Sequence, residues 1–245
     1  MQYRAASQPN ALAGQPPLAS CNSHVATHFL DAAWVGTDMW MGMWPQGAIY
    51  LPWDIWAVTW IVAALWADRT VKRPAIGREI VYRIIALAGF VLLLGAALRE
   101  RNGHLEFASF PGILGKQIWM APLAVNWAMV GIAALAFAFA WWARIHLGRL
   151  WSGRVTRKEG HHIVDTGPYA IVRHPIYTGI LAGAVATTVV LGQVHAILGT
   201  VLLIIGYWIK ARLEERFLRE ELGPQDYDAY RRRVPMLVPF GPKAA

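Results

Sequence analysis

Five stretches of the chain are rich in apolar residues and close to the roughly 20 residues that a helix needs to cross a bilayer. They are residues 48–67, 80–98, 120–142, 175–192, and a fifth that begins near 195, is apolar to Ile209 and continues as an amphipathic helix to about Leu222. Only residues 192–195 separate the last two stretches, which indicates a tight antiparallel hairpin. The pattern predicts an all-α polytopic membrane protein with five transmembrane helices, in a domain of residues 48–245.

The basic residues predict the orientation of these helices. The numbers of Lys and Arg in the six successive segments outside the spans are 1, 4, 3, 6, 0 and 8. Because basic residues gather on the cytoplasmic side, this alternation places the N-terminus outside and the C-terminus in the cytoplasm. Residues 143–174 and 210–245 then lie on the same, cytoplasmic side, where they can form a common site.

Composition supports a membrane location. The chain is 56% hydrophobic with 13 Trp and a net charge of +8, and its mean hydropathy is +0.34. Most of the basic residues flank apolar stretches, and no aromatic-interleaved basic patch suggests nucleic-acid binding. The wealth of Ala, Trp and Arg is typical of a bacterial protein, so we expect a bacterial inner-membrane location. Residues 1–47 lack sustained periodicity, and we expect a flexible segment there.

A polar stretch at residues 159–179 stands between two apolar segments and carries the candidate chemistry. Pro175 suits the first turn of a helix and keeps His174 out of the α region. Arg173 and His174 are therefore expected in extended backbone just before a helix N-terminus, which attracts anionic groups. Tyr177 follows within the first turn.

The pair Glu214–Glu215 follows the apolar part of the last helix. It is either an interfacial charge cluster, stabilised by basic residues three or four positions away, or part of a site. Because one helix of the expected hairpin begins where the other ends, either glutamate should lie near His174 and Tyr177. No metal site is expected: His161 and His162 are adjacent on a loop without a third ligand at suitable spacing, and Cys21 is the one cysteine.

These residues resemble the isoprenylcysteine carboxyl methyltransferase family. The first half of the resemblance is Gly167-Pro168-Tyr169 followed by Arg173-His174-Pro175-x-Tyr177-x-Gly179. The second half is Glu214-Glu215, then Gly223, Tyr227, Tyr230 and Val234-Pro235-x-x-x-Pro239-Phe240. The match covers roughly residues 144–240, and both halves occur in order on either side of one apolar hairpin.

The resemblance implies a membrane enzyme that uses S-adenosyl-L-methionine to methylate a carboxylate of an isoprenylcysteine-like or other lipophilic acceptor. It implies that the cofactor contacts His161, Val164, Gly167, Tyr169, His174, Pro175, Tyr177 and Glu215. It implies catalytic roles for Arg173, Glu214 and Glu215. Arg173 is expected to clamp the acceptor carboxylate with its planar fork, and Glu215 to hold the cofactor.

Three alternatives remain open at this point. A phospholipid N-methyltransferase shares the expected architecture, but an amine acceptor needs a base such as His174 or a glutamate. A sterol-type membrane reductase would use NADPH, and a non-enzymatic protein could retain the same scaffold. A Rossmann methyltransferase or P-loop enzyme is disfavoured, because neither glycine-rich motif is present. Arg144, Arg149 and Trp151 fit plain membrane topology and the family pattern equally well.

Overall fold

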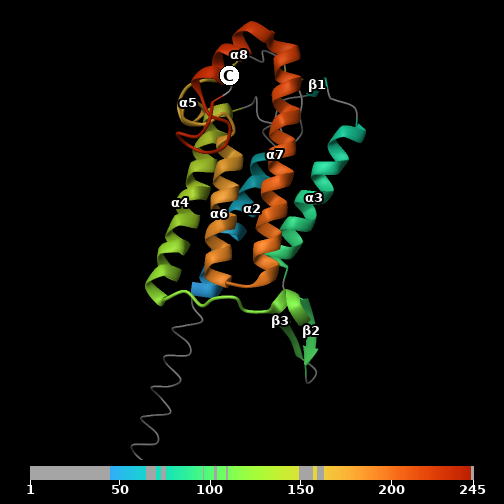
Figure 1. Cartoon of the computed structure of the whole chain (residues 1–245), viewed down its shortest axis with the longest axis vertical. Helices are drawn as coiled ribbons and strands as arrows, with labels where there is room; N and C mark the ends of the chain where they lie inside the picture. Colours follow the sequence, from blue (N-terminus) through green and yellow to red (C-terminus); the bar gives the residue numbers. More distant parts are fainter. Residues whose placement is uncertain are drawn as a thin grey trace, which may run out of the picture. The chain divides into compact units, whose positions relative to one another are not determined.

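The computed structural model describes residues 45–64, 70–72, 76–95, 97–101, 104–108, 110–148, 157–158 and 163–243. Helices dominate the architecture, as predicted, and one helix overlaps each of the five apolar stretches (Figure 1). The helices are α2 (Leu51–Ala64), α3 (Ile76–Leu94), α4 (Leu123–Leu147), α5 (Pro168–Ile171), α6 (Pro175–Leu191), α7 (Val194–Leu222) and α8 (Pro224–Arg233), with a 3₁₀ turn η1 at Gly112–Gly115. The expected flexible segment 1–47 lies almost entirely outside the described residues.

Four short strands form two antiparallel pairs that the all-α prediction did not include. β2 (Ala97–Arg101) pairs with β3 (His104–Ala108), and β1 (Thr70–Lys72) pairs with β4 (Arg157–Lys158). Besides these two pairs, the described residues include an isolated bridge between Gln117 and Gln193, so the helices determine where the candidate site lies.

Proline and glycine mark the limits of the last three helices. Pro175 occupies the first turn of α6, and Gly192, with φ 60° and ψ 24°, ends it by donating its N–H to the Thr188 carbonyl. Gly192 and Gln193 alone connect α6 to α7, and the Thr188 and Thr200 hydroxyls lie 2.7 Å apart. The chain therefore turns back at Gly192, and α7 runs along α6.

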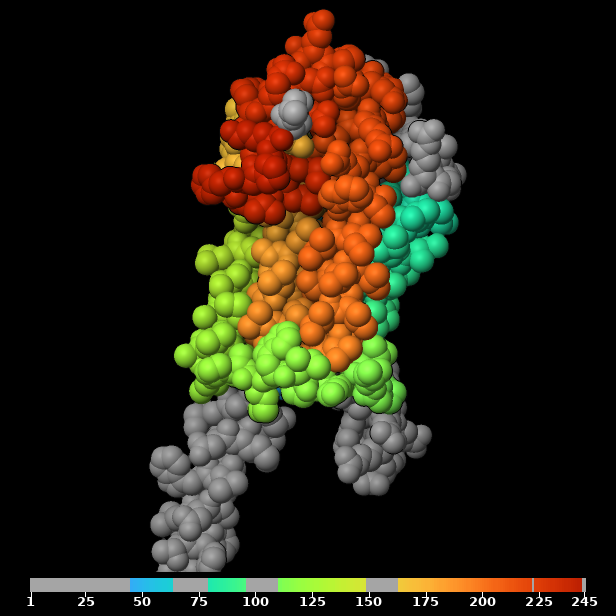
Figure 2. All heavy atoms as spheres, in the orientation of Figure 1, coloured from blue at the N-terminus to red at the C-terminus, as the bar shows by residue number. Residues whose placement is uncertain are grey.

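A second segment supports this turn. Residues 110–122, light green in Figure 2, cross the ends of α6 and α7. Ile118 N–H donates to the Gly192 carbonyl at 2.8 Å, and Val194 N–H donates to the Lys116 carbonyl at 3.2 Å. These bonds satisfy backbone groups at the end of the helix pair that lies away from α5 and α8.

The helices pack mainly as two pairs, α4 with α6 and α3 with α7. The shared core includes Trp53, Leu93, Phe137, Ile180 and Leu203, all buried. Gly179 of α6 lies against α4, where a Cβ atom would meet the Ala136 carbonyl and approach the Ala140 Cβ to 2.9 Å. A small residue at this position lets two backbones approach closely, as is usual where helices pack in a membrane.

Large apolar side chains on the outward faces of α2, α3, α4 and α7 are exposed, among them Leu51, Ile61, Leu87, Leu135 and Val201. Among the described helices, α4 and α7 are long and apolar enough to cross a membrane, whereas α6 is apolar but shorter. The apolar part of α7 ends near Ile209. Residues 210–222 carry eight charged side chains, so we expect this end of α7 to lie outside the hydrocarbon layer.

We predict that Gly179→Ala lowers the thermal unfolding midpoint of the detergent-solubilised protein, because its methyl group cannot fit against α4. Overpacking of this kind costs about 1–3 kcal/mol. Gly131→Ala on α4 is the matched control, since no atom lies within 4 Å of the position of its Cβ. It should leave the midpoint unchanged or raise it slightly, and an equal loss in both variants would contradict the close packing.

Candidate active site

The candidate site is built where the extended residues 172–174 meet the C-terminal segment. Arg173 N–H donates to the Pro235 carbonyl at 2.9 Å, and His174 N–H donates to the Met236 carbonyl at 3.1 Å. The Thr178 hydroxyl, one turn into α6, donates to the Leu237 carbonyl at 2.6 Å. Pro175 permits this pairing, because it starts α6 and leaves the two residues before it extended. The two halves of the sequence motif are therefore joined by backbone hydrogen bonds.

Arg173 is buried and contacts three parts of the chain. Its Nε donates to Glu215 Oε1 at 2.7 Å, and both side chains are only 4% exposed. Its Nη1 donates to the carbonyls of Arg231, at 3.1 Å, and of Val234. The guanidinium therefore links α7 and the end of α8 to the residues that precede α6. The predicted role of Arg173 is to clamp an acceptor carboxylate. In the structure its Nε and Nη1 atoms instead donate hydrogen bonds within the protein.

Glu215 is the anionic centre of the cluster. Besides Arg173, its carboxylate lies 3.3 Å from His174 Nε2 and 3.4 Å from Arg231 Nε. Burial by itself raises the pKa of this carboxyl, but the hydrogen bonds and charges of His174 and Arg173 outweigh burial and hold the pKa at about 2. Because the ordinary value is 4.5, the ionised form stabilises the fold above that pH, and the contribution is lost as the pH falls toward 2.

Glu214 faces a different group of side chains. It accepts a hydrogen bond from the Tyr177 hydroxyl at 2.6 Å, and its side chain is 25% exposed. The imidazole of His174 stacks on the ring of Tyr177, with the ring centres 5.2 Å apart and an angle of 5° between the ring planes. His174 also contacts Glu215 through its Nε2 atom. The structure therefore brings His174, Tyr177 and both glutamates together, as expected from the predicted hairpin.

The Gly167–Tyr169 turn is held by its neighbours in the protein. Gly167 has φ 56°, and a Cβ there would lie 2.8 Å from His146 Cε1. His146 also lies 2.9 Å from the Thr166 hydroxyl and stacks on the Tyr169 ring. The Tyr230 hydroxyl donates to the Tyr169 carbonyl at 2.8 Å. The requirement for glycine at 167 thus has an internal explanation, namely its conformation and the imidazole beside it.

Some predicted residues lie elsewhere or outside the described residues. Val164 packs at the edge of the main core, next to the turn. Arg144 donates to the Gly148 carbonyl at 2.7 Å and to the Ala63 carbonyl at 2.8 Å, so it ties the end of α4 to the end of α2. His161, predicted to bind the cofactor, and Arg149 and Trp151 lie outside the described residues.

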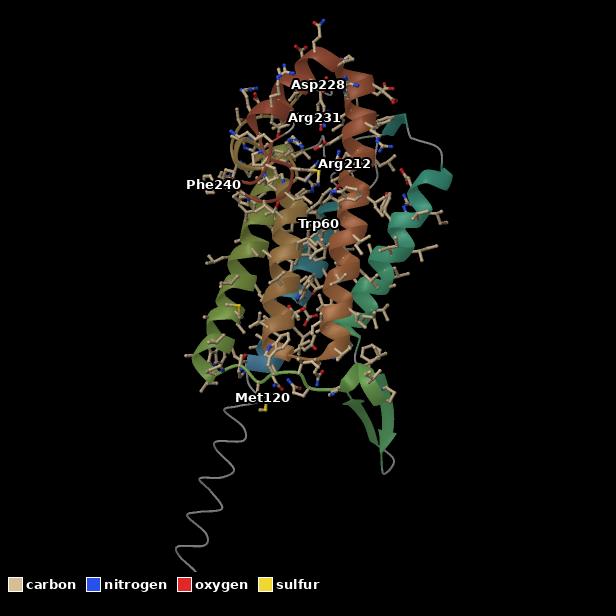
Figure 3. The ribbon with its side chains drawn as sticks, viewed as in Figure 1. Trp60, Met120, Arg212, Asp228, Arg231 and Phe240 are labelled. Carbon is tan, nitrogen blue, oxygen red and sulfur yellow. The ribbon has the colours of Figure 1, made fainter. Side chains whose placement is uncertain are left out.

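Two cations at the site were not singled out in the sequence. Arg231 is one of the eight Lys and Arg from residue 210 onward, and Lys210 is one of the basic residues three or four positions from the glutamate pair. The Lys210 ammonium lies 4.8 Å above the Tyr177 ring. Arg231, labelled in Figure 3 on α8, reaches back to Glu215 on α7. The position of Lys210, one helical turn before Glu214, was the sequence signal that could have identified Lys210.

Fold and site together define a helical membrane protein that carries a buried cluster of arginine, histidine and two glutamates at one end of its apolar helices. Among the described residues, no group of three His, Cys, Asp or Glu side chains is arranged to hold a metal ion. The contacts within the cluster are ion pairs and hydrogen bonds.

Comparison with known sequences identifies the family. Residues 129–220 match the sequence model described as "Isoprenylcysteine carboxyl methyltransferase (ICMT) family". The resemblance found in the motif is therefore confirmed by a match over this part of the chain.

Individual relatives agree with the family match. The chain is 32% identical over 138 residues to protein-S-isoprenylcysteine O-methyltransferase B of Arabidopsis thaliana. It is 34% identical over 87 residues to protein-S-isoprenylcysteine O-methyltransferase of Schizosaccharomyces pombe. It is also 26% identical over 131 residues to the cobalt-zinc-cadmium resistance protein CzcN of Cupriavidus metallidurans. These alignments cover 55%, 35% and 49% of the chain, and 66%, 36% and 51% of the relatives, less than two thirds of each.

We predict that Glu215→Gln destabilises the protein much more than Glu214→Gln. Removing the buried charge of Glu215 leaves Arg173 without its counterion, which costs about 3–5 kcal/mol. Glutamine at 214 can still accept the Tyr177 hydroxyl, so its loss should be about 1 kcal/mol or less. Thermal unfolding of both variants in the same detergent measures the difference. A larger loss for Glu214→Gln would mean that the partly exposed carboxylate, and not the buried one, stabilises the site.

Proposed function

We propose that the protein is a membrane methyltransferase that transfers a methyl group from S-adenosylmethionine to the carboxylate of a lipophilic acceptor, isoprenylcysteine-like or otherwise. The observation that carries the proposal is the union of the two motif halves in one buried cluster. Arg173 and His174 of the first half contact Glu215 of the second, and the C-terminal segment closes over both through backbone bonds. Family membership and the names of the relatives support the same reaction class.

The residues present suit this cofactor, which carries an ammonium group, a sulfonium, a carboxylate and ribose hydroxyls. Glu214 is a partly exposed carboxylate whose position is set by Tyr177, so it can receive a cationic group. Arg231, whose side chain is 25% exposed and borders Glu215, presents a cation beside it that can receive a carboxylate. We assign the cofactor to this side of the cluster, against His174, Tyr177 and the turn of Gly167 and Tyr169.

We propose that Arg173 and Glu215 act as positioning residues for this site. The charges of Arg173 and Glu215 neutralise each other, and their contacts with Arg231 and Val234 fix α8 and the C-terminal segment beside the site. Glu214 and His174 then present their remaining polar atoms from a fixed frame. This assignment replaces the expectation that Glu215 binds the cofactor directly while Arg173 clamps the acceptor.

When bound, S-adenosylmethionine supplies an electrophilic methyl group, whose bond to sulfur breaks as a bond to the acceptor oxygen forms, leaving the electron pair on sulfur. A carboxylate acceptor is ionised at neutral pH, so no residue has to remove a proton. The protein then contributes alignment and exclusion of water. Tyr230, which donates to the Tyr169 carbonyl, and the C-terminal segment, which pairs with Arg173 and His174, serve the second purpose.

We further propose five membrane spans with the N-terminus outside and the site on the cytoplasmic side of a bacterial inner membrane. Helices α2, α3, α4, α6 and α7 overlap the five apolar stretches, and α6 and α7 meet the candidate site at the start of α6 and the charged end of α7. The alternation of basic residues along the chain supports this orientation.

The orientation predicts opposite locations for the two ends of the chain. Reporter fusions at Arg4 and at Lys243 should be active on opposite sides of the membrane, with the fusion at Lys243 in the cytoplasm. A cytoplasmic signal from both fusions would contradict an odd number of spans.

The cofactor assignment predicts that S-adenosylhomocysteine binds with micromolar affinity, about −8 kcal/mol, and that NADPH does not bind. Glu214→Gln should weaken this binding by about 1–3 kcal/mol, the contribution of a hydrogen bond to a charged group. Glu220→Gln, an exposed glutamate farther along α7, is the control and should bind as the wild type does. Calorimetry on the detergent-solubilised protein measures all three. Binding of NADPH without S-adenosylhomocysteine would favour a reductase.

A further inference from the structure

The C-terminal segment, residues 234–243, ends in a turn that has no role in the function proposed so far. The Gly241 N–H donates to the Val238 carbonyl at 2.9 Å, and Phe240 between them has φ 61°. With Pro239 as its second residue, the turn has the residue pattern of a type II turn, whose third position favours glycine. A bulky side chain at such a φ is an outlier. The strained backbone of Phe240 therefore indicates that the side chain has a use of its own.

That use is not packing inside the protein. Phe240 is 100% exposed and Val238 is 64% exposed, whereas residues 234–235 are buried and residues 236–237 are half-buried. Figure 3 shows Phe240 at the outer edge of the molecule, on the side of α4. Single exposed apolar side chains are common on protein surfaces. Here two of them stand together on a turn whose backbone is strained.

The segment runs from the candidate site toward the apolar helices. The carbonyls of residues 235–237 accept hydrogen bonds, in that order, from Arg173 N–H, His174 N–H and the Thr178 hydroxyl. Each step along the segment thus meets a residue farther along α6. The turn follows directly, so it lies beyond the site, on the side of the apolar helices.

The level of the turn can be compared with the end of α4. Gly179 of α6 packs against Ala140, and α4 continues from there to Leu147, which is about 10 Å farther at the rise of an α-helix. Over this stretch α4 presents the exposed apolar side chains of Trp142 and Ile145. In the proposed topology lipid covers such surfaces, so the turn lies at a level where lipid is available to its side chains.

The residues around the turn are basic. Residues 231–243 include four basic and no acidic residues. Arg231 and Arg233 pair with acidic residues of the protein, and Arg232 and Lys243 are exposed on either side of the turn. Anionic lipids of the cytoplasmic leaflet attract basic residues that lie within about a Debye length of the surface. An apolar tip between cations therefore complements a surface with anionic head groups and an apolar interior.

We propose that the C-terminal segment docks on an anionic membrane surface, with Phe240 and Val238 inserted in the lipid. Arg232 and Lys243 then lie against the head groups. This inference rests on the proposed membrane arrangement but not on the methyltransferase reaction. Burial of the phenyl ring in lipid offsets the strain of its backbone. Lipid thereby holds in place the carbonyls that bind the residues before α6, so the membrane surface stabilises one side of the candidate site.

Amide hydrogen exchange at Arg173 and His174 reports whether the segment is docked, because both N–H groups donate to its carbonyls. For the full-length protein in nanodiscs that contain phosphatidylglycerol, Phe240→Gly should speed exchange at both amides by about tenfold, through loss of the aromatic contact with lipid. The same change relieves the backbone strain. If the turn only had to fold, glycine would slow exchange, so equal or slower exchange in Phe240→Gly would overturn the proposal.

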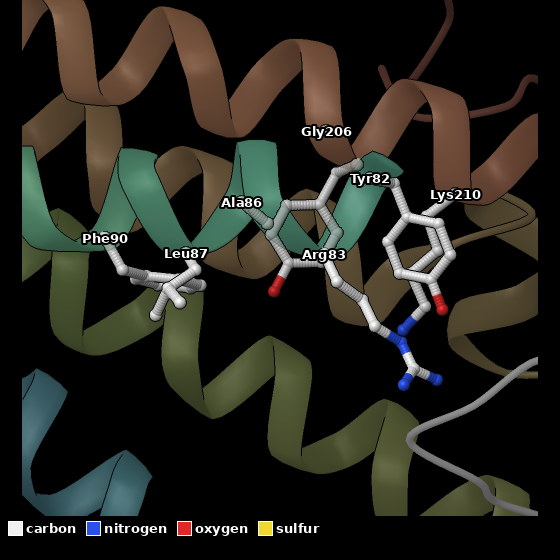
Figure 4. A pocket seen from close by; sticks show the side chains of 8 residues that line it. Tyr82, Arg83, Ala86, Leu87, Phe90, Gly206 and Lys210 are labelled. Atoms are coloured by element: carbon white, nitrogen blue, oxygen red, sulfur yellow. The ribbon is translucent and has the colours of Figure 1, made fainter. Parts of the chain in front are cut away.

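Two further variants are matched controls. Phe240→Leu keeps an apolar side chain and should retain most of the protection. Leu87→Ser removes a 66% exposed apolar side chain from α3 and should leave exchange at the two amides unchanged. Leu87 lies at the groove between α3 and α7 in Figure 4, whose lining includes the cations Arg83 and Lys210 but no residue of the C-terminal segment.

A fluorescent label at position 240 locates the side chain directly. Cys21→Ser removes the one native cysteine, and Phe240→Cys in that background can carry an environment-sensitive fluorophore. Nitroxide-labelled lipid should quench this fluorophore, and iodide in the water should not. The same label at Asp226→Cys, on the first turn of α8, should show the reverse. Quenching of the position-240 label by iodide and not by lipid would place the side chain in water and contradict docking.

The charge of the head groups is tested by leaving phosphatidylglycerol out. Exchange at Arg173 and His174 should be faster in phosphatidylcholine alone, and Arg232→Gln combined with Lys243→Gln should abolish the difference. Exchange that ignores phosphatidylglycerol would refute an anionic surface, and protection that rises with protein concentration in detergent would assign Phe240 to a contact between two copies. None of these measurements contains S-adenosylhomocysteine, so its failure to bind would count against the methyltransferase and leave the docking in place.

Discussion

The buried ion pair between Arg173 and Glu215 is the interaction on which the organisation of the site depends. Taking two full charges out of water costs several kilocalories per mole for each ion, so such a pair persists only where further hydrogen bonds accompany it. Here Arg173 donates to the Arg231 and Val234 carbonyls, and Glu215 is approached by His174 and Arg231. These partners come from three separate parts of the chain. The cost of burying the charges is offset only when all three are assembled, which makes the site a single structural unit.

The membrane helices supply the frame that this unit needs. A linker of two residues turns α7 back along α6, so the start of one helix and the charged part of the other lie at the same end. The glycine at 179 lets α6 approach α4, and Pro175 leaves Arg173 and His174 extended enough to pair with Pro235 and Met236. Each of these is a constraint on backbone geometry. The charged residues of the site are therefore positioned by the packing of largely apolar helices.

Neighbouring residues on a helix point about 100° apart, and the two glutamates show what this means for function. Glu215 faces inward and pairs with Arg173, so it stabilises the site. Glu214 faces Tyr177 and remains partly exposed. Lys210, one turn earlier, lies on the Glu214 side and borders the groove of α3. The charged end of α7 thus has one face that pairs with Arg173 inside the protein and one, at Glu214, that stays partly exposed.

The sequence by itself determined the helical class, the positions of the five apolar helices and the family, because those depend on patterns that each segment carries alone. The short linker between residues 191 and 194 also made the meeting of His174 and Tyr177 with the glutamates predictable. Only the tertiary structure decided that Arg173 is engaged by Glu215 and by carbonyls near residue 234, that His146 covers Gly167, and that α3 adds a cationic groove. The strands of β1 and β4, two or three residues long, carry too little pattern to be recognised. The physical reason is the same for all of these: a contact between residues far apart in the chain depends on how helices pack, and hydrophobic periodicity reports which face of a helix is buried but not which partner it meets.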